Sequence, residues 1–252
     1  MLRAYSVTDI GPVRQMNEDC FVIDEPLCLL VVADGMGGHN AGEVAAQTAV
    51  EAIRDYVGGF RPDDPWPYGY EAAISQAGNL LRTAVHVANA VVFELASATP
   101  AYAGMGTTVV AAIVRDGLLS VAHVGDSRGY LIGDAGLTRL TQDDTWMASI
   151  LAHDPQADPA LFAHHPMRHA LTNVVGCQLV TDVHLIEVPL GGGERIALTT
   201  DGVHGVVEDA RIAQVLATPV EGASAAETLL REALTSGSRD NCTVVVADYR
   251  LN

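Results

Sequence analysis

Hydrophobic and polar positions along the chain change their spacing several times, and each spacing predicts a different kind of element. Apolar residues that alternate with polar ones, or follow one another in short runs, predict strands over 2–9, 20–24 and 27–34. Small and apolar residues then recur at helical spacing over 42–57 and roughly 70–97. The short break between these two stretches predicts an antiparallel pair of helices.

The second half of the chain predicts more strands and a second pair of helices. Short β segments separated by turn signals run from residue 106 to about 141, which indicates an antiparallel meander. An irregular stretch rich in His and Pro follows. Further elements are predicted as strands at 182–190 and 194–201, helices at roughly 208–217 and 222–236, and a last strand at 241–249. This order indicates one α+β domain over 1–252, with layered sheets and helices.

Composition and charge narrow the function classes. Apolar residues make up 49% of the 252, which is enough for a sizeable core. The formal net charge of −17 disfavours binding to nucleic acid or to an anionic membrane, because both partners require a basic face. The acidic surplus has two interpretations, a solvated acidic surface or carboxylates gathered around a cation, and the first must explain most of it.

Other sequence features bear on the compartment. The chain has four Cys without zinc-ligand spacing, no signal-peptide core at its N-terminus, and no apolar run near the roughly 20 residues of a membrane span. We therefore expect a soluble cytoplasmic protein, and a monomer.

The acidic residues fall at the ends of predicted strands. Asp34, Asp126 and Asp201 each close a strand, whereas Asp240 and the pair Glu18–Asp19 open others. In an antiparallel sheet the end of one strand lies beside the start of its neighbour. The six acids are therefore predicted to meet at one sheet edge.

Six converging carboxylates would repel one another unless a cation compensates them. Mg²⁺ and Mn²⁺ prefer carboxylate oxygens, carbonyls and water, and no Cys or His cluster accompanies the acids to favour zinc or copper. The competing interpretation is ordinary turn chemistry, since Asp beside Gly is common in turns. It explains any single acid better than it explains all of them at the same kind of boundary.

A two-metal carboxylate site has a specific use. It produces hydroxide near neutral pH and neutralises charge around phosphorus, which suits phosphoester hydrolysis. Arg14 stands four residues before Glu18 and can hold a phosphate by two hydrogen bonds. From its position alone, an exposed surface residue is the better interpretation of Arg14.

Six segments of the chain together resemble a known family. They read GPVRQMNED, VVADGMGGHNAGE, GMGTTVVAAIV, VAHVGDSRGYLI, LTTDGV and SRDNCTVVVAD. In this order they resemble metal-dependent Ser/Thr protein phosphatases of type 2C (PPM), and bacterial members in particular. The resemblance spans nearly the whole chain. It implies an α-β-β-α sandwich of two antiparallel sheets flanked by antiparallel helix pairs, with a flap at roughly 146–170.

The resemblance also implies roles for single residues. Asp34 would bridge two core metals and the Gly35 carbonyl would join one, while Asp201 and Asp240 would complete that metal's ligands. Glu18 would serve the other metal, Asp19 would hold metal-bound waters, and Asp126 with Asp201 would support a third, weaker metal. Arg14 would bind the substrate phosphate. Asn241 would steady the start of the last strand, and Thr107 and Thr108 would have a packing role.

The glycine-rich stretch Val31–Glu43 has two interpretations. Its glycines fit a phosphate cradle, but the Lys of a phosphate-binding loop is missing. The resemblance favours a loop whose small residues let Asp34 and the Gly35 carbonyl approach a pair of metals.

The chain departs from the family pattern at two places. Met36 replaces a His that animal relatives carry, which leaves the acid for the leaving group open between His39 and metal-bound water. Asp143-Asp144-Thr145 stands where the family usually has Asp-His-Ser, which we expect to affect the flap rather than the chemistry. Nearby, His165 and His169 have the spacing of a zinc pair on a helix, but Pro166 and the lack of a third ligand argue against one.

The resemblance implies hydrolysis of phosphoserine and phosphothreonine in proteins, by a water bridging two Mn²⁺ or Mg²⁺ ions that attacks phosphorus in line. The alternative is a pseudophosphatase that binds phosphoproteins without turnover. A different metal-dependent hydrolase, such as a nuclease, is a weaker third interpretation, which the acidic charge disfavours. The expected partners are phosphoproteins modified by a cytoplasmic Ser/Thr kinase, and neither nucleic acid nor membrane is expected.

Overall fold

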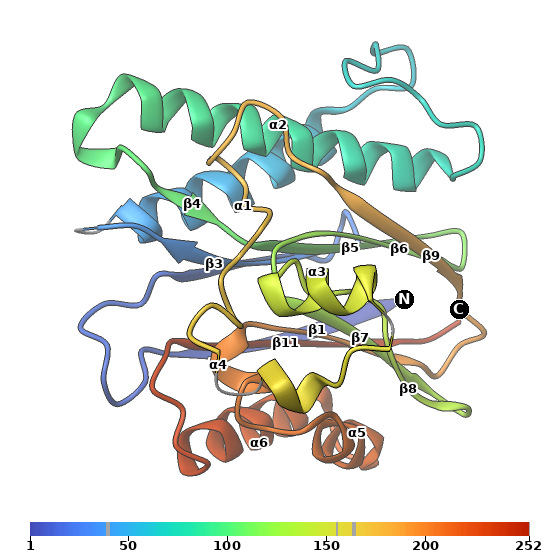
Figure 1. Ribbon diagram of the computed structural model, residues 1–252. Helices are drawn as coiled ribbons and strands as arrows, with labels where there is room; N and C mark the ends of the chain where they lie inside the picture. The colour runs from blue at the N-terminus through green and yellow to red at the C-terminus, as the bar shows by residue number, and fades with distance from the viewer. Residues whose placement is uncertain (39–40, 155, 163–164, 252) are drawn as a thin grey trace.

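Two antiparallel β-sheets stack face to face, and helices cover the outer face of each (Figure 1). The computed structural model describes residues 1–38, 41–154, 156–162 and 165–251. Sheet A has the strand order β1 (Leu2–Asp9), β11 (Cys242–Tyr249), β10 (Arg195–Thr199), β7 (Arg128–Gly133), β8 (Gly136–Arg139). Sheet B has the order β2 (Asp19–Asp24), β3 (Leu29–Met36), β5 (Val109–Arg115), β6 (Leu118–Val124), β9 (His184–Pro189), and the short β4 (Gly106–Thr107) pairs with β3.

The helices form the two outer layers. Sheet B is covered by α1 (Ala41–Gly59) and α2 (Gln76–Ala98), and sheet A by α5 (Asp209–Ala217) and α6 (Gly222–Thr235) (Figure 1). The remaining helical segments are α3 (Trp146–His153), α4 (Asp201–His204), η1 (Pro100–Tyr102) and η2 (Pro159–Phe162). The predicted α-β-β-α sandwich is confirmed.

Strands with continuous apolar sequence are covered on both faces. Successive side chains of a strand point to opposite faces. Leu29 and Val31 of β3 accordingly pack with the α1–α2 layer, whereas Leu30 and Val32 pack between the sheets. The same alternation in β11 divides its apolar residues between the inter-sheet core and the α5–α6 layer. Three apolar layers thus hold the four structural layers together.

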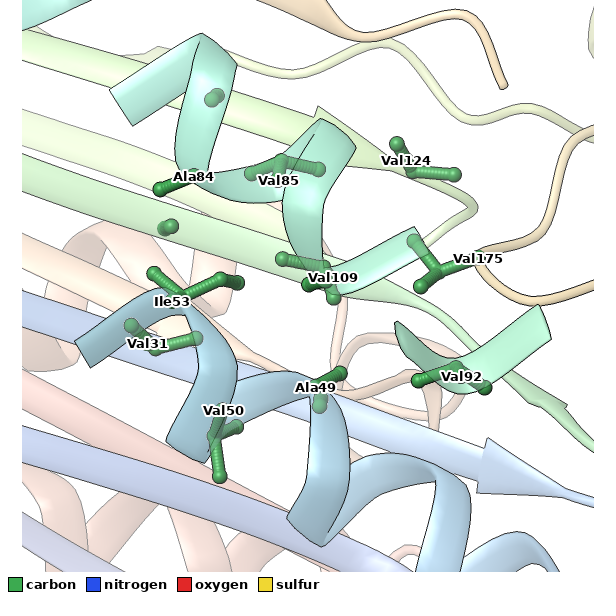
Figure 2. Packing of buried hydrophobic residues seen from close by; sticks show 14 of the residues in the cluster. Val31, Ala49, Val50, Ile53, Ala84, Val85, Val92, Val109, Val124 and Val175 are labelled. Carbon is green, nitrogen blue, oxygen red and sulfur yellow. The ribbon is translucent and has the colours of Figure 1, made fainter. Parts of the chain in front are cut away.

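Small residues let the α1–α2 pair approach sheet B closely. Figure 2 shows Ala49 and Ile53 of α1 beside Val31 of β3, with Val85 of α2 in the same cluster. Ile53 is 0% exposed, so its side chain contributes about 1.5–3 kcal/mol relative to an exposed position. This packing fixes the N-terminal end of α1 beside the end of β3, where the acidic residues gather.

Two predicted boundaries were wrong, each for a local reason. The second helix begins at Gln76 rather than near 70, because the Ser75 hydroxyl accepts the Gly78 N–H as an N-cap. The Asn79 side chain also ties down the segment before it by bonding Glu71. Asp201 begins α4 instead of closing a strand, since β10 ends two residues earlier.

Helix α2 is the single helix of the described residues long and apolar enough, by length and composition, to cross a membrane. About 44% of its most apolar stretch is buried inside the protein, against α1 and sheet B. A core helix of this kind passes the same test, so the finding is weak evidence for a span.

Candidate metal centre

One end of the sandwich holds a polar cavity of about 240 Å³, lined by five acidic side chains. They are Glu18, Asp34, Asp126, Asp201 and Asp240. Each comes from a different place in the chain: before β2, within β3, between β6 and β7, at the start of α4, and before β11. These acids converge as predicted, but they come from both sheets and meet at one end of the sandwich rather than at the edge of a single sheet.

The sixth predicted acid, Asp19, lies just behind the cavity. It is the first residue of β2 and pairs in register with Asp34 of β3, so the two carboxylates belong to neighbouring strands. One of its carboxylate oxygens, Oδ2, accepts a hydrogen bond from the Thr200 hydroxyl at 2.9 Å. This contact links sheet B to the turn that leads into Asp201.

Thr107 and Thr108 hold the backbone of Asp34. The Asp34 N–H donates to the Thr108 hydroxyl at 3.1 Å, and the Thr107 hydroxyl donates to the Asp34 carbonyl at 2.9 Å. The packing role expected for the two threonines is therefore too narrow, because their hydroxyls fix the peptide that carries the central acid. Thr108 also shares a 2.7 Å hydrogen bond with Ser127, next to Asp126.

Two glycines allow the backbone to close around Glu18. A Cβ added at Gly35 would lie 2.0 Å from the Gly42 carbonyl oxygen, and one at Gly42 would lie 2.3 Å from Glu18 Oε1. Any larger residue would force the start of α1 away from β3. The small residues of this loop are therefore required for close approach, as the sequence suggested.

Asn241 organises the loop that carries Arg14 and Glu18. Its Nδ2 donates to the carbonyls of Ile10 and Met16 at 2.8 and 2.9 Å, and its Oδ1 accepts the Glu18 N–H at 2.8 Å. We expected it to steady the start of the last strand. Its observed contacts instead fasten the N-terminal loop to that strand.

Arg14 lies at the edge of the cavity. Its side chain is 48% exposed, and Nη2 donates to Asp240 Oδ2 at 2.6 Å. The structure thus places this guanidinium beside the acids rather than on a remote surface. The remaining N–H groups of the side chain can meet an incoming anion.

The acids are strongly perturbed by one another. Burial, with repulsion from neighbouring carboxylates, raises the pKa of Asp34 well above its ordinary value and the pKa of Asp19 to about 7. Burial and repulsion from Asp201 also raise the pKa of Asp126 to about 7. The pKa values of Glu18 and Asp201 are raised, mainly by burial. Ionising all of these groups together is therefore unfavourable without a compensating cation.

The donor set fits a hard divalent cation. Within the described part of the chain, the buried oxygens Asp19 Oδ1 and Asp201 Oδ1 have no hydrogen-bond partner. Among the same residues, no three His, Cys, Asp or Glu side chains already surround one metal position. Carboxylate oxygens with unused lone pairs in a polar cavity suit Mg²⁺ or Mn²⁺ better than soft metals.

Two residues where the flap ends, His169 and Leu171, line the same cavity as the acids. The sequence analysis considered His169 only as half of a zinc pair. That pairing finds no support, because His165 stacks on Trp146 with ring centroids 4.3 Å apart, whereas His169 lines the cavity. Its position where the flap returns to the body was the available signal. His39, one of the two candidates for the leaving-group acid, lies outside the described residues.

Comparisons with known proteins agree with this geometry. A family model described as Protein phosphatase 2C matches residues 14–236. The chain is 36% identical over 249 residues to the serine/threonine protein phosphatase PstP of Mycobacterium tuberculosis, covering 98% of this chain and 45% of that protein. It therefore spans less than half the length of this mycobacterial relative. It is 30% identical to the serine/threonine phosphatase stp of Listeria monocytogenes, covering 97% of this chain and 94% of the other.

Solved structures give the same result. The catalytic domain of PstP in complex with two manganese ions superposes with a TM-score of 0.81 at 35% identity, covering 99% of both chains. Stp1 from Staphylococcus aureus superposes with a TM-score of 0.84 at 30% identity, covering 100% of this chain and 96% of that one.

Proposed function

The chain belongs to the protein phosphatase 2C family, and on that premise we propose that it hydrolyses phosphoserine and phosphothreonine in proteins with Mn²⁺ or Mg²⁺. One observation carries the proposal: five acids and Arg14 line a single cavity, with a buried Asp201 oxygen that lacks a partner among the described residues. The manganese ions of the PstP catalytic domain support the choice of metal.

The family resemblance assigns the residues that would hold the cations, and all of them line the cavity. Asp34 would be shared between two cations, the Gly35 carbonyl, Asp201 and Asp240 would hold one of them, and Glu18 would hold the other. When bound, the cations lower the pKa of a water molecule and neutralise negative charge on the phosphate. Asp19 would act from behind through its unpartnered Oδ1, and Asp126 would form a weaker position with Asp201.

The chain's own residues would bind and orient the substrate. Arg14 would donate its N–H groups to the phosphate oxygens, while its Nη2 contact with Asp240 keeps the guanidinium pointed at the cavity. His169 faces the same space from the flap and would hold a proton near the leaving hydroxyl. Within the described residues it is better placed for that role than any other His, because it alone lines the cavity.

The alternative is a pseudophosphatase that binds phosphoproteins without turnover. The retained acids favour the enzyme, since a module that only binds phosphate has no need to bury carboxylates at raised pKa. The expected substrates are proteins phosphorylated by a cytoplasmic Ser/Thr kinase. We expect the flap and the surrounding surface, rather than the metal site, to select among them.

An assay of phosphate release from a phosphothreonine peptide distinguishes the phosphatase from the pseudophosphatase. We expect release of phosphate with Mn²⁺ or Mg²⁺, none after EDTA, and recovery when Mn²⁺ is returned. Asp34→Asn should lose nearly all turnover, whereas the matched change Asp134→Asn, at an exposed turn, should lose none. Peptide binding without phosphate release by the wild-type chain at saturating Mn²⁺ would establish the binding module instead.

A further inference from the structure

Two adjacent acids, Asp143 and Asp144, lie outside the metal centre at the base of the flap. Their side chains are only 18% and 13% exposed. Burying two neighbouring carboxylates is costly unless each has strong partners. Their partners belong to the loop around Asp126, to residues 172–173 just after the flap, and to β9.

Asp143 holds one side of the Asp126 loop. Its two oxygens accept hydrogen bonds from Arg128 Nε at 2.9 Å and Nη2 at 2.6 Å, a bidentate pair. Arg128 begins β7, two residues after Asp126. The bidentate geometry therefore fixes where β7 starts.

Asp144 holds the other side of the same loop. Its Oδ2 accepts the Gly125 N–H at 2.9 Å, and its own N–H donates to the Gly125 carbonyl at 3.0 Å. Gly125 has φ +95°, and an added Cβ there would lie 2.7 Å from the Thr108 side chain. Asp126 thus directly follows Gly125, which is bonded to Asp144, and stands two residues before Arg128, which is bonded to Asp143.

Asp144 also holds the base of the flap. The Thr172 N–H donates to its carbonyl at 2.8 Å, and Asn173 Nδ2 donates to its Oδ2 at 2.8 Å. Its Oδ1 accepts from His184 Nε2 of β9 at 2.9 Å. Thr172 directly follows Leu171, which lines the metal cavity from the flap.

We propose that Asp144, supported by Asp143, is a positioning residue that sets the place of Asp126 relative to the cavity-lining flap residues His169 and Leu171. One side chain bonds both segments, so the metal-facing acid and the substrate-facing flap share a single reference point. The inference rests on the proposed function, in which Asp126 supplies the weaker metal position and the flap meets the substrate.

The carboxylate of Asp144 is the acceptor that joins the Asp126 loop to the base of the flap. Donors from Gly125, Asn173 and His184 converge on its two oxygens. An Asn could keep all three contacts, because its oxygen can replace Oδ2 and its NH₂ group can donate to the other tautomer of His184. An Ala removes all three side-chain contacts and leaves the backbone bonds of residue 144 in place.

The test compares Asp144→Ala with the wild-type chain by Mn²⁺ titration calorimetry, amide hydrogen exchange and peptide kinetics. We expect the weaker class of Mn²⁺ sites to lose roughly tenfold in affinity while the tighter sites stay unchanged. The amides of Gly125 and Thr172 should exchange roughly tenfold faster, because each loses a bond or its anchor. We expect kcat to fall and to recover at higher Mn²⁺, with a smaller change in KM.

Two further variants separate positioning from general destabilisation. Asp182→Asn changes an exposed acid that lines a surface pocket together with Asp143 and Asp144, and should leave all three readouts unchanged. Arg128→Lys keeps the charge but loses the bidentate pair. It should weaken the same class of Mn²⁺ sites while Thr172 stays protected.

Two results overturn the proposal. One is an Asp144→Ala protein with wild-type exchange and Mn²⁺ binding; the other is an Asp144→Ala protein in which all Mn²⁺ sites weaken and all amides exchange faster together. Should even the wild-type chain release no phosphate, the proposed function fails, and the calorimetry and exchange still decide the role of Asp144.

Discussion

Replacing Asp126 by Asn is expected to stabilise the metal-free protein at neutral pH, although it removes an acid of the metal centre. Asp126 is 9% exposed, and burial followed by repulsion from Asp201 and Asp143 raises its pKa from 3.8 to about 7. In the unfolded chain the group keeps its ordinary value. The folded state therefore prefers the neutral acid, and Asn is its closest neutral replacement.

The direction of the pH effect follows from the raised pKa. Stability contributed by neutral Asp126 is fully present below pH 3.8 and is lost as the pH rises through 7. A rise from 3.8 to about 7 corresponds to an upper limit of roughly 4 kcal/mol, since each pKa unit is worth about 1.4 kcal/mol. Relaxation and water entry reduce such penalties, so we expect Asp126→Asn to gain about 2 kcal/mol at pH 8.

Urea unfolding in EDTA, at about pH 5 and about pH 8, measures this gain. The free energy of unfolding of the variant should exceed that of the wild type at both pH values, by less than half as much at the lower pH as at the higher one, because most of the effect develops as the pH rises toward the raised pKa of about 7. Saturating Mn²⁺ should reverse the order, because the wild-type chain gains more from binding. Asp134→Asn, at an exposed turn, serves as the control. The reasoning is refuted if the difference in free energy of unfolding between variant and wild type does not increase with pH, or if the variant is the less stable protein at pH 8.

Three further predictions concern packing and substrate binding. Gly42→Ala should weaken Mn²⁺ binding measured by calorimetry at least tenfold, because its Cβ would lie 2.3 Å from Glu18 Oε1, whereas Gly38→Ala has nothing within 4 Å and should bind as the wild type does. Ile53→Ala should cost about 2–5 kcal/mol in urea unfolding, since the side chain is 0% exposed, and a cost below about 1 kcal/mol would contradict the packing described. Arg14→Ala should raise KM for a phosphothreonine peptide roughly tenfold or more with a smaller effect on kcat, and an unchanged KM would remove it from the substrate site.

Much of the fold was predictable because the pattern of apolar residues in a strand indicates which of its faces are buried. The continuous apolar run of β3 can only be satisfied when both faces are covered, and the structure covers one with α1 and the other with sheet A. The start of α2 was less predictable, since residues near 70 have a helical composition. There, the contacts of Asn79 with Glu71 hold the segment outside the helix, and these are tertiary details that no local pattern reveals.

The acids of the metal centre were also predictable, because each lies within two residues of the start or end of a strand and antiparallel pairing brings strand ends together. The residues that hold these acids in place, and the histidine that shares their cavity, were not predictable. The use of Thr107 and Thr108 as anchors for the Asp34 peptide depends on the exact pairing of β4 with β3. The place of His169 depends on backbone contacts that no periodicity reveals. The N–H groups of Trp146 and Met147 donate to the carbonyls of Ala170 and Arg168 on either side of it, and the Thr172 N–H donates to the Asp144 carbonyl.

The contact between Arg14 and Asp240 joins residues 226 positions apart in the chain. Asn241 bonds the same N-terminal loop through Ile10, Met16 and Glu18. A nascent chain that ends before residue 240 therefore lacks Asp240, and it also lacks the contacts that hold the loop carrying Arg14. Truncated products of interrupted translation would then be catalytically silent, and binding of Mn²⁺ would report that synthesis and folding of this region are both complete.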